Sequence, residues 1–317
     1  MYYRHFGLTR PPFEFGIRPG RIYEGREQRE ATAAISWGLL HEPSGYTLLV
    51  GVPGTGKTTL INAVLAEHHQ LRAAYLSYPK AEPLEIFRNA LTQLGSRASQ
   101  LSKYDCVEAF RNCLKSLRGD ERLALIFDEA QALSPLLFEE LRLLVNCASL
   151  GERRMQIVFV GQPSILKRLE APMLRQLNER IGARVLLRPM PNSDAHEYIE
   201  HRLRACNGAV SKVFARKALD MIVQNSRGIP RKLNLLCHNA MLSAYADGMK
   251  QVNASTVSKV ISEFQNLLGA ASDSPAEIRP PVWRRFLKFG AAAMLFSSIG
   301  IEKGLLQEAS RTISRHV

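Results

Sequence analysis

The stretch YTLLVGVPGTGKTT, from Tyr46 to Thr59, decides the fold. Its first part, Tyr46–Gly51, is almost wholly apolar, which is typical of a strand buried on both faces of a parallel sheet. Glycines stand at positions 51, 54 and 56, and glycine lets the backbone wrap closely enough for successive N–H groups to point at an anion. The residues that follow, Thr58–His69, read as a helix whose first turn adds a partial positive charge. The stretch therefore predicts a strand, a phosphate-binding loop and a helix in succession.

The ligand that this loop predicts is a nucleoside triphosphate, namely ATP with Mg²⁺. Lys57 is expected to reach the β- and γ-phosphates, and the Thr58 hydroxyl is expected to ligate Mg²⁺. The loop is a specific signal because an apolar strand precedes it and a helix follows it. The residues expected to bind the nucleotide here are Gly51, Val52, Pro53, Gly54, Thr55, Gly56, Lys57, Thr58 and Thr59.

A pair of carboxylates follows another apolar run, Leu123–Phe127. Two acids at the end of a buried strand are costly unless a cation or hydrogen bonds neutralise them, which favours a functional pair over two exposed turn residues. Asp128 is predicted to hold Mg²⁺, directly or through water. Glu129 is predicted to orient and polarise the water that attacks the γ-phosphate, so the sequence indicates hydrolysis as well as binding.

Strand patterns alternate with helical patterns as far as Pro189. Besides Tyr46–Gly51, strands are predicted at Arg72–Tyr78, Leu123–Phe127, Gln156–Val160 and Ala183–Leu187. This alternation predicts an α/β fold with a doubly wound parallel sheet, in which ligands lie at the carboxyl ends of the strands. The strands then stop, and a small all-helical lid domain is predicted from helices at Ser193–Cys206, Ser211–Gln224, Arg231–Ala246 and Ala254–Leu268.

Three polar side chains further along are candidates for sensing the nucleotide. Gln162 follows a predicted strand and either contacts the attacking water or is a plain loop residue. Arg180 precedes the last predicted strand; it either projects into a neighbouring subunit's nucleotide, with Arg175 the next candidate, or forms surface ion pairs. Arg231 opens a lid helix behind Gly228-Ile-Pro230 and either reaches the γ-phosphate, coupling nucleotide state to the lid, or is an ordinary helix arginine.

The composition indicates a reduced, basic protein. The 317 residues include 42 Lys and Arg against 29 Asp and Glu, a net charge of +13 and a pI near 9.8. This excess indicates either an acidic partner, such as nucleic acid or an anionic membrane face, or charge spread over solvated helix faces. The 5 cysteines form no C-x-x-C pair and the 8 histidines show no metal-ligand spacing. The N-terminal MYYRHFGLTRPPFEF carries early charges and is unlike a secretory signal, so a cytoplasmic location is expected.

The C-terminal part of the chain joins a basic stretch to an apolar one. Arg284, Arg285 and Lys288 surround Trp283, and Phe289–Ile301 carries no charged residue. The apolar segment is shorter than the roughly 20 residues of a spanning helix. Three interpretations stay open: a helix that spans the inner membrane and leaves the basic side cytoplasmic, a helix that lies in an anionic membrane interface, or a helix packed on protein.

These motifs, in this order and with a helical lid, resemble those of AAA+ ATPases. The segments IYEGREQREA, IFDEAQALS, QIVFVGQP, LRQLNERIGARVLLRPM and GIPRKLNLLCHNAMLSAYADG are similar to the ExeA/GspA secretion-ATPase family, as is the N-terminal sequence. The resemblance implies an oligomeric cytoplasmic motor or switch that assembles an envelope secretion, pilus or polysaccharide-export complex. It also implies that Tyr23 and Glu27–Ala31 pack the adenine.

The expected organisation follows from these patterns. We predict an N-terminal extension (1–30), an AAA+ ATPase domain (31–190), a helical lid (191–268), a linker with a basic end (269–285), an apolar membrane or packing helix (286–303) and a tail (304–317). Two alternatives to the envelope function stay open: a DNA-acting ATPase similar to transposition regulators, which the net charge favours, and a nucleotide-dependent scaffold with little turnover.

Overall fold

The computed structural model describes residues 2–14, 23–77, 81–148 and 154–269. The predicted apolar helix and tail, and all of the predicted linker except Gly269, lie outside these residues. The chain divides into two compact units. One unit comprises Phe13–Arg202 and Ser226–Leu235, and the other comprises the described residues of Met1–Pro12, Leu203–Asn225 and Leu236–Val317. The domain boundaries drawn from the sequence stay a prediction.

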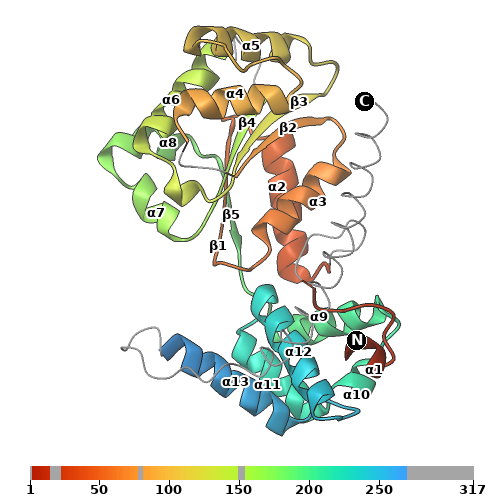
Figure 1. The fold of residues 1–317 in the computed structure, drawn as a ribbon. Coiled ribbons are helices and arrows are strands. Elements are labelled where there is room, and N and C mark those ends of the chain that lie inside the picture. The colour runs from red at the N-terminus through yellow and green to blue at the C-terminus, as the bar shows by residue number, and fades with distance from the viewer. Residues whose placement is uncertain (1, 15–22, 78–80, 149–153, 270–317) are drawn as a thin grey trace, which may run out of the picture. The chain divides into compact units, whose positions relative to one another are not determined.

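The first unit is built on a parallel sheet with the strand order β2-β3-β4-β1-β5 (Figure 1). The strands are β1 (Tyr46–Gly51), β2 (Leu71–Leu76), β3 (Arg122–Phe127), β4 (Met155–Gly161) and β5 (Ala183–Leu187). All four neighbouring pairs are parallel, so the carboxyl ends of the strands lie along one edge. The phosphate loop, the carboxylate pair and Gln162 follow β1, β3 and β4, which are adjacent in the sheet, and these residues therefore gather at this edge.

Helices cover both faces of the sheet, which confirms the predicted doubly wound α/β fold (Figure 1). One face is covered by α2 (Arg26–Leu40) and α3 (Lys57–Glu67), which share a buried cluster with Leu49, Ile126 and Val160. The other face packs against α4 (Pro83–Gln93), α5 (Lys103–Lys115) and α6 (Pro135–Ala148). The remaining elements of this unit are η1 (Ala130–Ala132), α7 (Ser164–Leu169), η2 (Pro172–Leu174) and α8 (Arg175–Arg180).

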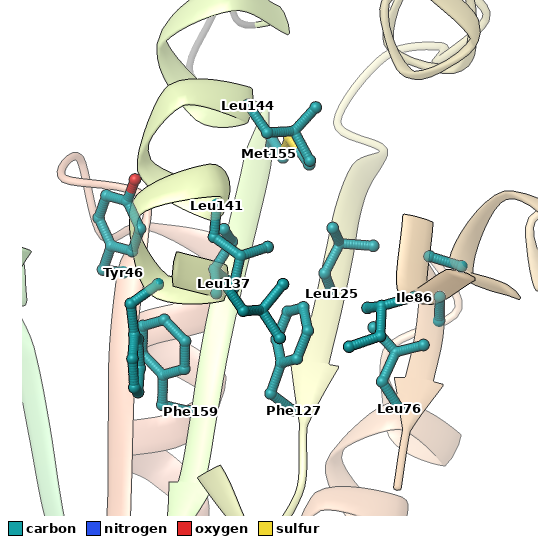
Figure 2. Packing of buried hydrophobic residues seen from close by; sticks show 14 of the residues in the cluster. Tyr46, Leu76, Ile86, Leu125, Phe127, Leu137, Leu141, Leu144, Met155 and Phe159 are labelled. Atoms are coloured by element: carbon teal, nitrogen blue, oxygen red, sulfur yellow. The ribbon is translucent and has the colours of Figure 1, made fainter. Parts of the chain in front are cut away.

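Aromatic packing holds the centre of the sheet in place beneath α6. The Phe159 ring lies with its centroid 5.1 Å from that of Phe138 and 6.0 Å from that of Phe127. Figure 2 shows Leu137 and Leu141 of α6 above these rings. Each such side chain contributes about 1.5–3 kcal/mol when it is fully buried. This packing anchors β3 and β4, the strands that lead to the carboxylate pair and Gln162.

Two of the helices that flank the sheet, α4 and α5, begin with reciprocal capping pairs. Ser102 precedes α5, and its hydroxyl accepts a hydrogen bond from the Asp105 N–H, while the Asp105 side chain accepts one from the Ser102 N–H. Glu82 and Glu85 form a similar reciprocal pair at the start of α4, where Pro83 occupies the first helical position. Such caps satisfy backbone N–H groups that have no partner inside the helix.

The second unit is helical apart from one isolated bridge between Phe214 and Val252 in its described residues. Its elements are α1 (Tyr2–His5), α10 (Val210–Val213), α11 (Arg216–Ser226), most of α12 (Pro230–Ala246) and α13 (Ala254–Gly269), while α9 (Asn192–Arg204) leads into it. The chain's first residues belong here: the Tyr2 hydroxyl lies 3.0 Å from Nδ1 of His238, and the Thr9 N–H donates to the Cys206 carbonyl. Within the described residues, no helix has the length and apolar character needed to cross a membrane.

Candidate nucleotide-binding site

The phosphate loop connects β1 to α3, and its shape requires glycine. Gly54 and Gly56 have φ values of 83° and 98°, a region in which side chains other than hydrogen are strained. A Cβ atom on Gly54 would lie 2.7 Å from the Cβ of Arg231, and one on Gly51 would lie 2.9 Å from the Leu187 carbonyl oxygen. Gly56 is also the residue from which α3 begins. The loop thus presents backbone N–H groups and a helix N-terminus at one place, an arrangement suited to phosphate.

Lys57 is buried, with 6% of its surface exposed. Its ammonium donates to the Gly51 carbonyl at 2.9 Å and to the Val52 carbonyl at 3.4 Å. Burial lowers the pKa of Lys57, and this effect is opposed by the nearby carboxylates of Glu129 and Asp128. The charge is therefore held at the loop by the loop's own carbonyl groups and by the acidic pair, where a phosphate would compensate it further.

Asp128 is buried and its carboxylate accepts three hydrogen bonds. Oδ2 accepts from the Thr58 hydroxyl at 2.9 Å and from the Tyr75 hydroxyl. Oδ1 accepts from the Glu129 N–H at 2.8 Å. Thr58 and Asp128, which are far apart in the sequence, are thus in direct contact across the α3 N-terminus and the end of β3.

The Thr58–Asp128 pair is a set of hard oxygen donors that fits Mg²⁺. This cation takes one or two protein oxygens and completes its octahedron with phosphate oxygens and water. No cluster of three or more His, Cys, Asp or Glu side chains suited to a metal occurs among the described residues. A metal held by a Thr hydroxyl, one carboxylate and the nucleotide matches this donor set.

Glu129 adopts a left-handed backbone conformation, with φ of 51°. Such a conformation is uncommon outside glycine and is concentrated at functional sites. Its side-chain Oε2 accepts hydrogen bonds from the amides of Gln131 and, at 3.0 Å, of Gln162. The Gln162 N–H in turn donates to Oε1 of Gln131 at 3.0 Å. The structure therefore joins the predicted base, the predicted sensor and Gln131 in one network.

A cavity of about 480 Å³ extends from the phosphate loop. Lys57, Thr58 and Glu129 are among its lining residues. The lining also includes Tyr23, Leu60, Ala63, Tyr198 and Asn234, a mixture of apolar and aromatic surface with polar atoms that suits a nucleoside. The Tyr23 hydroxyl donates to Glu197 at 3.0 Å, and its ring meets Tyr198 edge to face.

The structure brings Arg231 to the phosphate loop but holds Arg180 elsewhere. Arg231 lines the cavity, and its N–H donates to the Gly54 carbonyl at 3.2 Å. Arg180 ends α8, is exposed, and donates to Oδ1 of Asn146 at 2.8 Å. Among the described residues that line the cavity, Arg180 is not found. Its predicted action on a neighbouring subunit stays a prediction.

Sequence reasoning missed two residues of this network, Tyr75 and Gln131. Gln131 lies within the segment DEAQ, and its distance from Asp128 could have placed it at the same strand end. Tyr75 lies in the predicted strand Arg72–Tyr78, which in the structure is β2, Leu71–Leu76. The feature that could have pointed to Tyr75 is its hydroxyl, a polar group in the strand that pairs with β3.

Comparison with known proteins finds a matching domain family and a relative. The family described as "AAA domain" matches residues 41–169. General secretion pathway protein A of Aeromonas hydrophila is 32% identical over 272 residues. This match covers 84% of the chain and 49% of the relative, so the chain spans about half the relative's length.

Solved structures share the fold at low sequence identity. The Aeropyrum pernix ORC2 protein in ADPNP–ADP complexes has a TM-score of 0.62 at 19% identity, covering 80% of this chain and 72% of that one. Drosophila ORC bound to DNA has a TM-score of 0.62 at 18% identity, covering 82% and 66%. The phosphate loop, the acidic pair and these sequence matches together identify the chain as an AAA+ protein related to general secretion pathway protein A.

Proposed function

We propose that this protein binds and hydrolyses ATP in a Mg²⁺-dependent reaction and that it works as an oligomeric switch in assembling an envelope complex. One observation carries the chemical part of the proposal: Thr58, whose hydroxyl donates to Asp128, lines the same cavity as Lys57 and Glu129. A metal site, a phosphate site and a carboxylate base at one place are the parts that triphosphate hydrolysis needs.

Some residues of the chain would hold the nucleotide and the metal, and another would activate the attacking water. The backbone N–H groups of the loop and the Lys57 ammonium hold the β- and γ-phosphates, and Thr58 and Asp128 hold the metal. Mg²⁺, when bound, neutralises charge on the phosphate oxygens. Glu129 orients a water molecule and accepts its proton as the water oxygen bonds to the γ-phosphorus and the bond to the β,γ-bridging oxygen breaks.

Two further side chains report the nucleotide state. Gln162 shares a hydrogen-bonded network with Glu129 and is suited to sensing the γ-phosphate or the attacking water. Arg231 lines the cavity beside the loop and is suited to carrying the same information into the helix that it opens. Arg180, exposed on α8, is the proposed contact to a neighbouring copy's nucleotide, which makes a homo-oligomer the working form.

Phosphate release under multiple turnover tests the hydrolysis. We expect Mg²⁺-dependent release from the wild-type protein and none above background from Lys57→Ala. Nucleotide binding without release in the wild-type protein at any concentration or temperature tested would contradict hydrolysis and favour the scaffold alternative.

The proposed client is an envelope secretion, pilus or polysaccharide-export complex, and two observations support it. The first is the identity to general secretion pathway protein A, and the second is the basic stretch before the apolar segment 286–303. The ATPase part is then cytoplasmic and attached to the inner membrane through this segment. Fractionation tests this: we expect membrane recovery that deletion of residues 279–317 abolishes. Full recovery of both proteins in the soluble fraction would contradict attachment.

A DNA-acting ATPase is the second candidate, because the net charge is +13 and solved structures with this fold include two bound to DNA. Titration with duplex DNA across a salt series, with and without ATP, separates the two functions. Nanomolar, ATP-dependent binding that weakens steeply with salt would favour DNA. Weak binding without nucleotide dependence would favour the envelope client.

A further inference from the structure

Tyr75 is a hydrogen-bond partner of Asp128 that neither the phosphate loop nor the acidic segment supplies. It lies on β2, opposite Ile126 of β3, and its hydroxyl donates to Oδ2 of Asp128. The same oxygen accepts from the Thr58 hydroxyl. Tyr75 and Thr58 thus approach one carboxylate oxygen, while the Glu129 N–H occupies the other.

A side chain of α4 fixes the backbone of Tyr75. Strand β2 is at the edge of the sheet, so the outward backbone groups of this strand have no neighbouring strand. The Gln93 amide takes that place: its Oε1 accepts from the Tyr75 N–H at 2.8 Å and its Nε2 donates to the Tyr75 carbonyl at 2.9 Å. Gln93 is itself oriented, because the same Nε2 donates to Oδ1 of Asn89 at 2.7 Å. Tyr75 is therefore held at its backbone and at its hydroxyl.

The direction of these hydrogen bonds matters for a metal site. When the Thr58 hydroxyl donates its proton to Asp128, the Thr58 oxygen keeps its lone pairs for a cation. This arrangement requires that the carboxylate stay in one orientation, and the Tyr75 hydroxyl helps to fix that orientation. A tyrosine phenol carries its proton at physiological pH, so it serves as a donor to the carboxylate.

We propose that Tyr75, with its backbone fixed by Gln93, is a positioning residue that orients Asp128 and thereby increases the affinity of the nucleotide complex for Mg²⁺. The inference rests on the proposed Mg²⁺–nucleotide function and adds a residue to it. A hydrogen bond that served only the stability of the sheet would leave metal affinity unchanged. Partners that orient metal ligands typically change metal affinity by about 10- to 100-fold when they are removed.

The test compares nucleotide binding with and without metal in Tyr75→Phe, which removes only the hydroxyl. The probe is a fluorescent, non-hydrolysable ATP analogue, titrated in Mg²⁺ and in EDTA. We expect the Kd in EDTA to match that of the wild-type protein within about twofold, and the tightening caused by Mg²⁺ to shrink about tenfold. Electron paramagnetic resonance can measure free Mn²⁺ when Mn²⁺ is added with the same analogue. We expect more free Mn²⁺ with Tyr75→Phe than with the wild-type protein, because the variant binds the metal more weakly.

Two further variants separate positioning from stability. Tyr104→Phe removes a hydroxyl from a tyrosine that is 72% exposed, and it should leave both Kd values unchanged. Gln93→Leu keeps the Tyr75 hydroxyl but removes the amide that holds the Tyr75 backbone. We therefore expect the tightening of analogue binding by Mg²⁺ to shrink about threefold, which is less than the range for removing a direct partner of a metal ligand. Thermal unfolding shows whether each variant is folded at the assay temperature.

The outcomes distinguish this inference from the proposed function. Wild-type protein whose analogue binding does not respond to Mg²⁺ would overturn the proposed metal–nucleotide function itself. Wild-type protein that responds, with an equal response in Tyr75→Phe, would overturn the role of Tyr75 alone. A parallel weakening in Mg²⁺ and in EDTA would also overturn it, because the hydroxyl would then support the whole nucleotide site. Should Tyr75→Phe fail to fold, the test rests on Gln93→Leu. An unchanged Mg²⁺ response in that variant would overturn the role of Tyr75.

Discussion

The phosphate loop and the acidic edge lie side by side in the same unit but are built from different parts of the chain. We use "acidic edge" for Asp128 and Glu129 with the side chains outside the phosphate loop and α3 that donate to them, Tyr75, Gln131 and Gln162. The loop is one continuous segment whose shape comes from its backbone, with glycines at positive φ and a helix that starts at Lys57, directly after Gly56. The acidic edge is an assembly of side chains from β2, η1 and the end of β4.

This difference predicts how each region responds to substitution. A backbone-built site loses its ligand when its one charged side chain is removed, because no other residue replaces the charge. A site assembled from several donors degrades in steps, because each donor orients a carboxylate that keeps its other partners. Changes in the loop should therefore abolish nucleotide binding. Changes around the carboxylates should affect nucleotide binding and hydrolysis to different extents.

Lys57→Ala gives the largest expected effect and tests the first half of the comparison. Truncating one partner of a buried charge–charge contact typically costs 2–5 kcal/mol, so we expect nucleotide affinity to fall about 100-fold or more and turnover to vanish. Equilibrium binding of a fluorescent nucleotide measures this loss of affinity. Lys103→Ala, which removes a lysine that is paired with Glu140 on the surface, is the matched control. Binding within tenfold of wild type would show that the backbone of the loop suffices. ATP-dependent assembly that survives the change would show that the loop does not control assembly.

Glu129→Gln tests whether the acidic edge separates binding from chemistry. The amide keeps the size of the side chain but cannot accept the proton of the attacking water, and a general base contributes about 10²- to 10⁴-fold. We therefore expect phosphate release to fall about 10³-fold while the Kd for ATP changes less than about threefold, as binding and single-turnover measurements would show. If release persists within tenfold, Glu129 is not the base, whatever its backbone conformation implies.

Arg180→Ala extends the comparison to a residue outside the cavity. Its exposed guanidinium is held by Asn146, and if it reaches a neighbouring copy its loss should lower turnover about 10²-fold at equal nucleotide affinity. Mixing this variant with Lys57→Ala supplies the mechanism test, because mixed oligomers pair an intact nucleotide site with an intact arginine. Recovery of turnover on mixing supports action in trans. A full rate in Arg180→Ala alone would move the role to Arg175.

Much of the loop and the fold could be predicted from the sequence, because their signals are local. The apolar run at Tyr46–Gly51 and the glycine spacing after it lie within one short segment, and strand–helix alternation sets the parallel sheet. The structure has all five predicted strands, and those that end at the site are β1, β3 and β4. Their adjacency in the sheet follows from the fold class more than from any single residue.

The acidic edge could be predicted only in part, because its geometry depends on contacts between distant segments. Asp128 and Glu129 stand out as two acids after an apolar strand, but the donors to them do not. Tyr75 becomes visible only once β2 is paired with β3, and its restraint by Gln93 only once α4 covers that strand. The position of Arg180 relative to a neighbour's nucleotide likewise depends on an assembly that a single chain does not specify.

Among the four substitutions that test this comparison, Gln131→Leu gives the smallest expected effect and tests the second half most directly. The Gln131 amide donates to Oε2 of Glu129 and accepts the Gln162 N–H, so its loss should displace both the base and the sensor without touching the phosphates. We expect turnover to fall about five- to tenfold with nucleotide affinity unchanged, the size of one or two lost hydrogen bonds, and single-turnover phosphate release measures it. A rise in turnover would reverse the interpretation, because the two glutamines would then restrain a carboxylate that is more active when released. A loss of turnover as large as that of Lys57→Ala would show that the acidic edge fails as a unit, as the loop does.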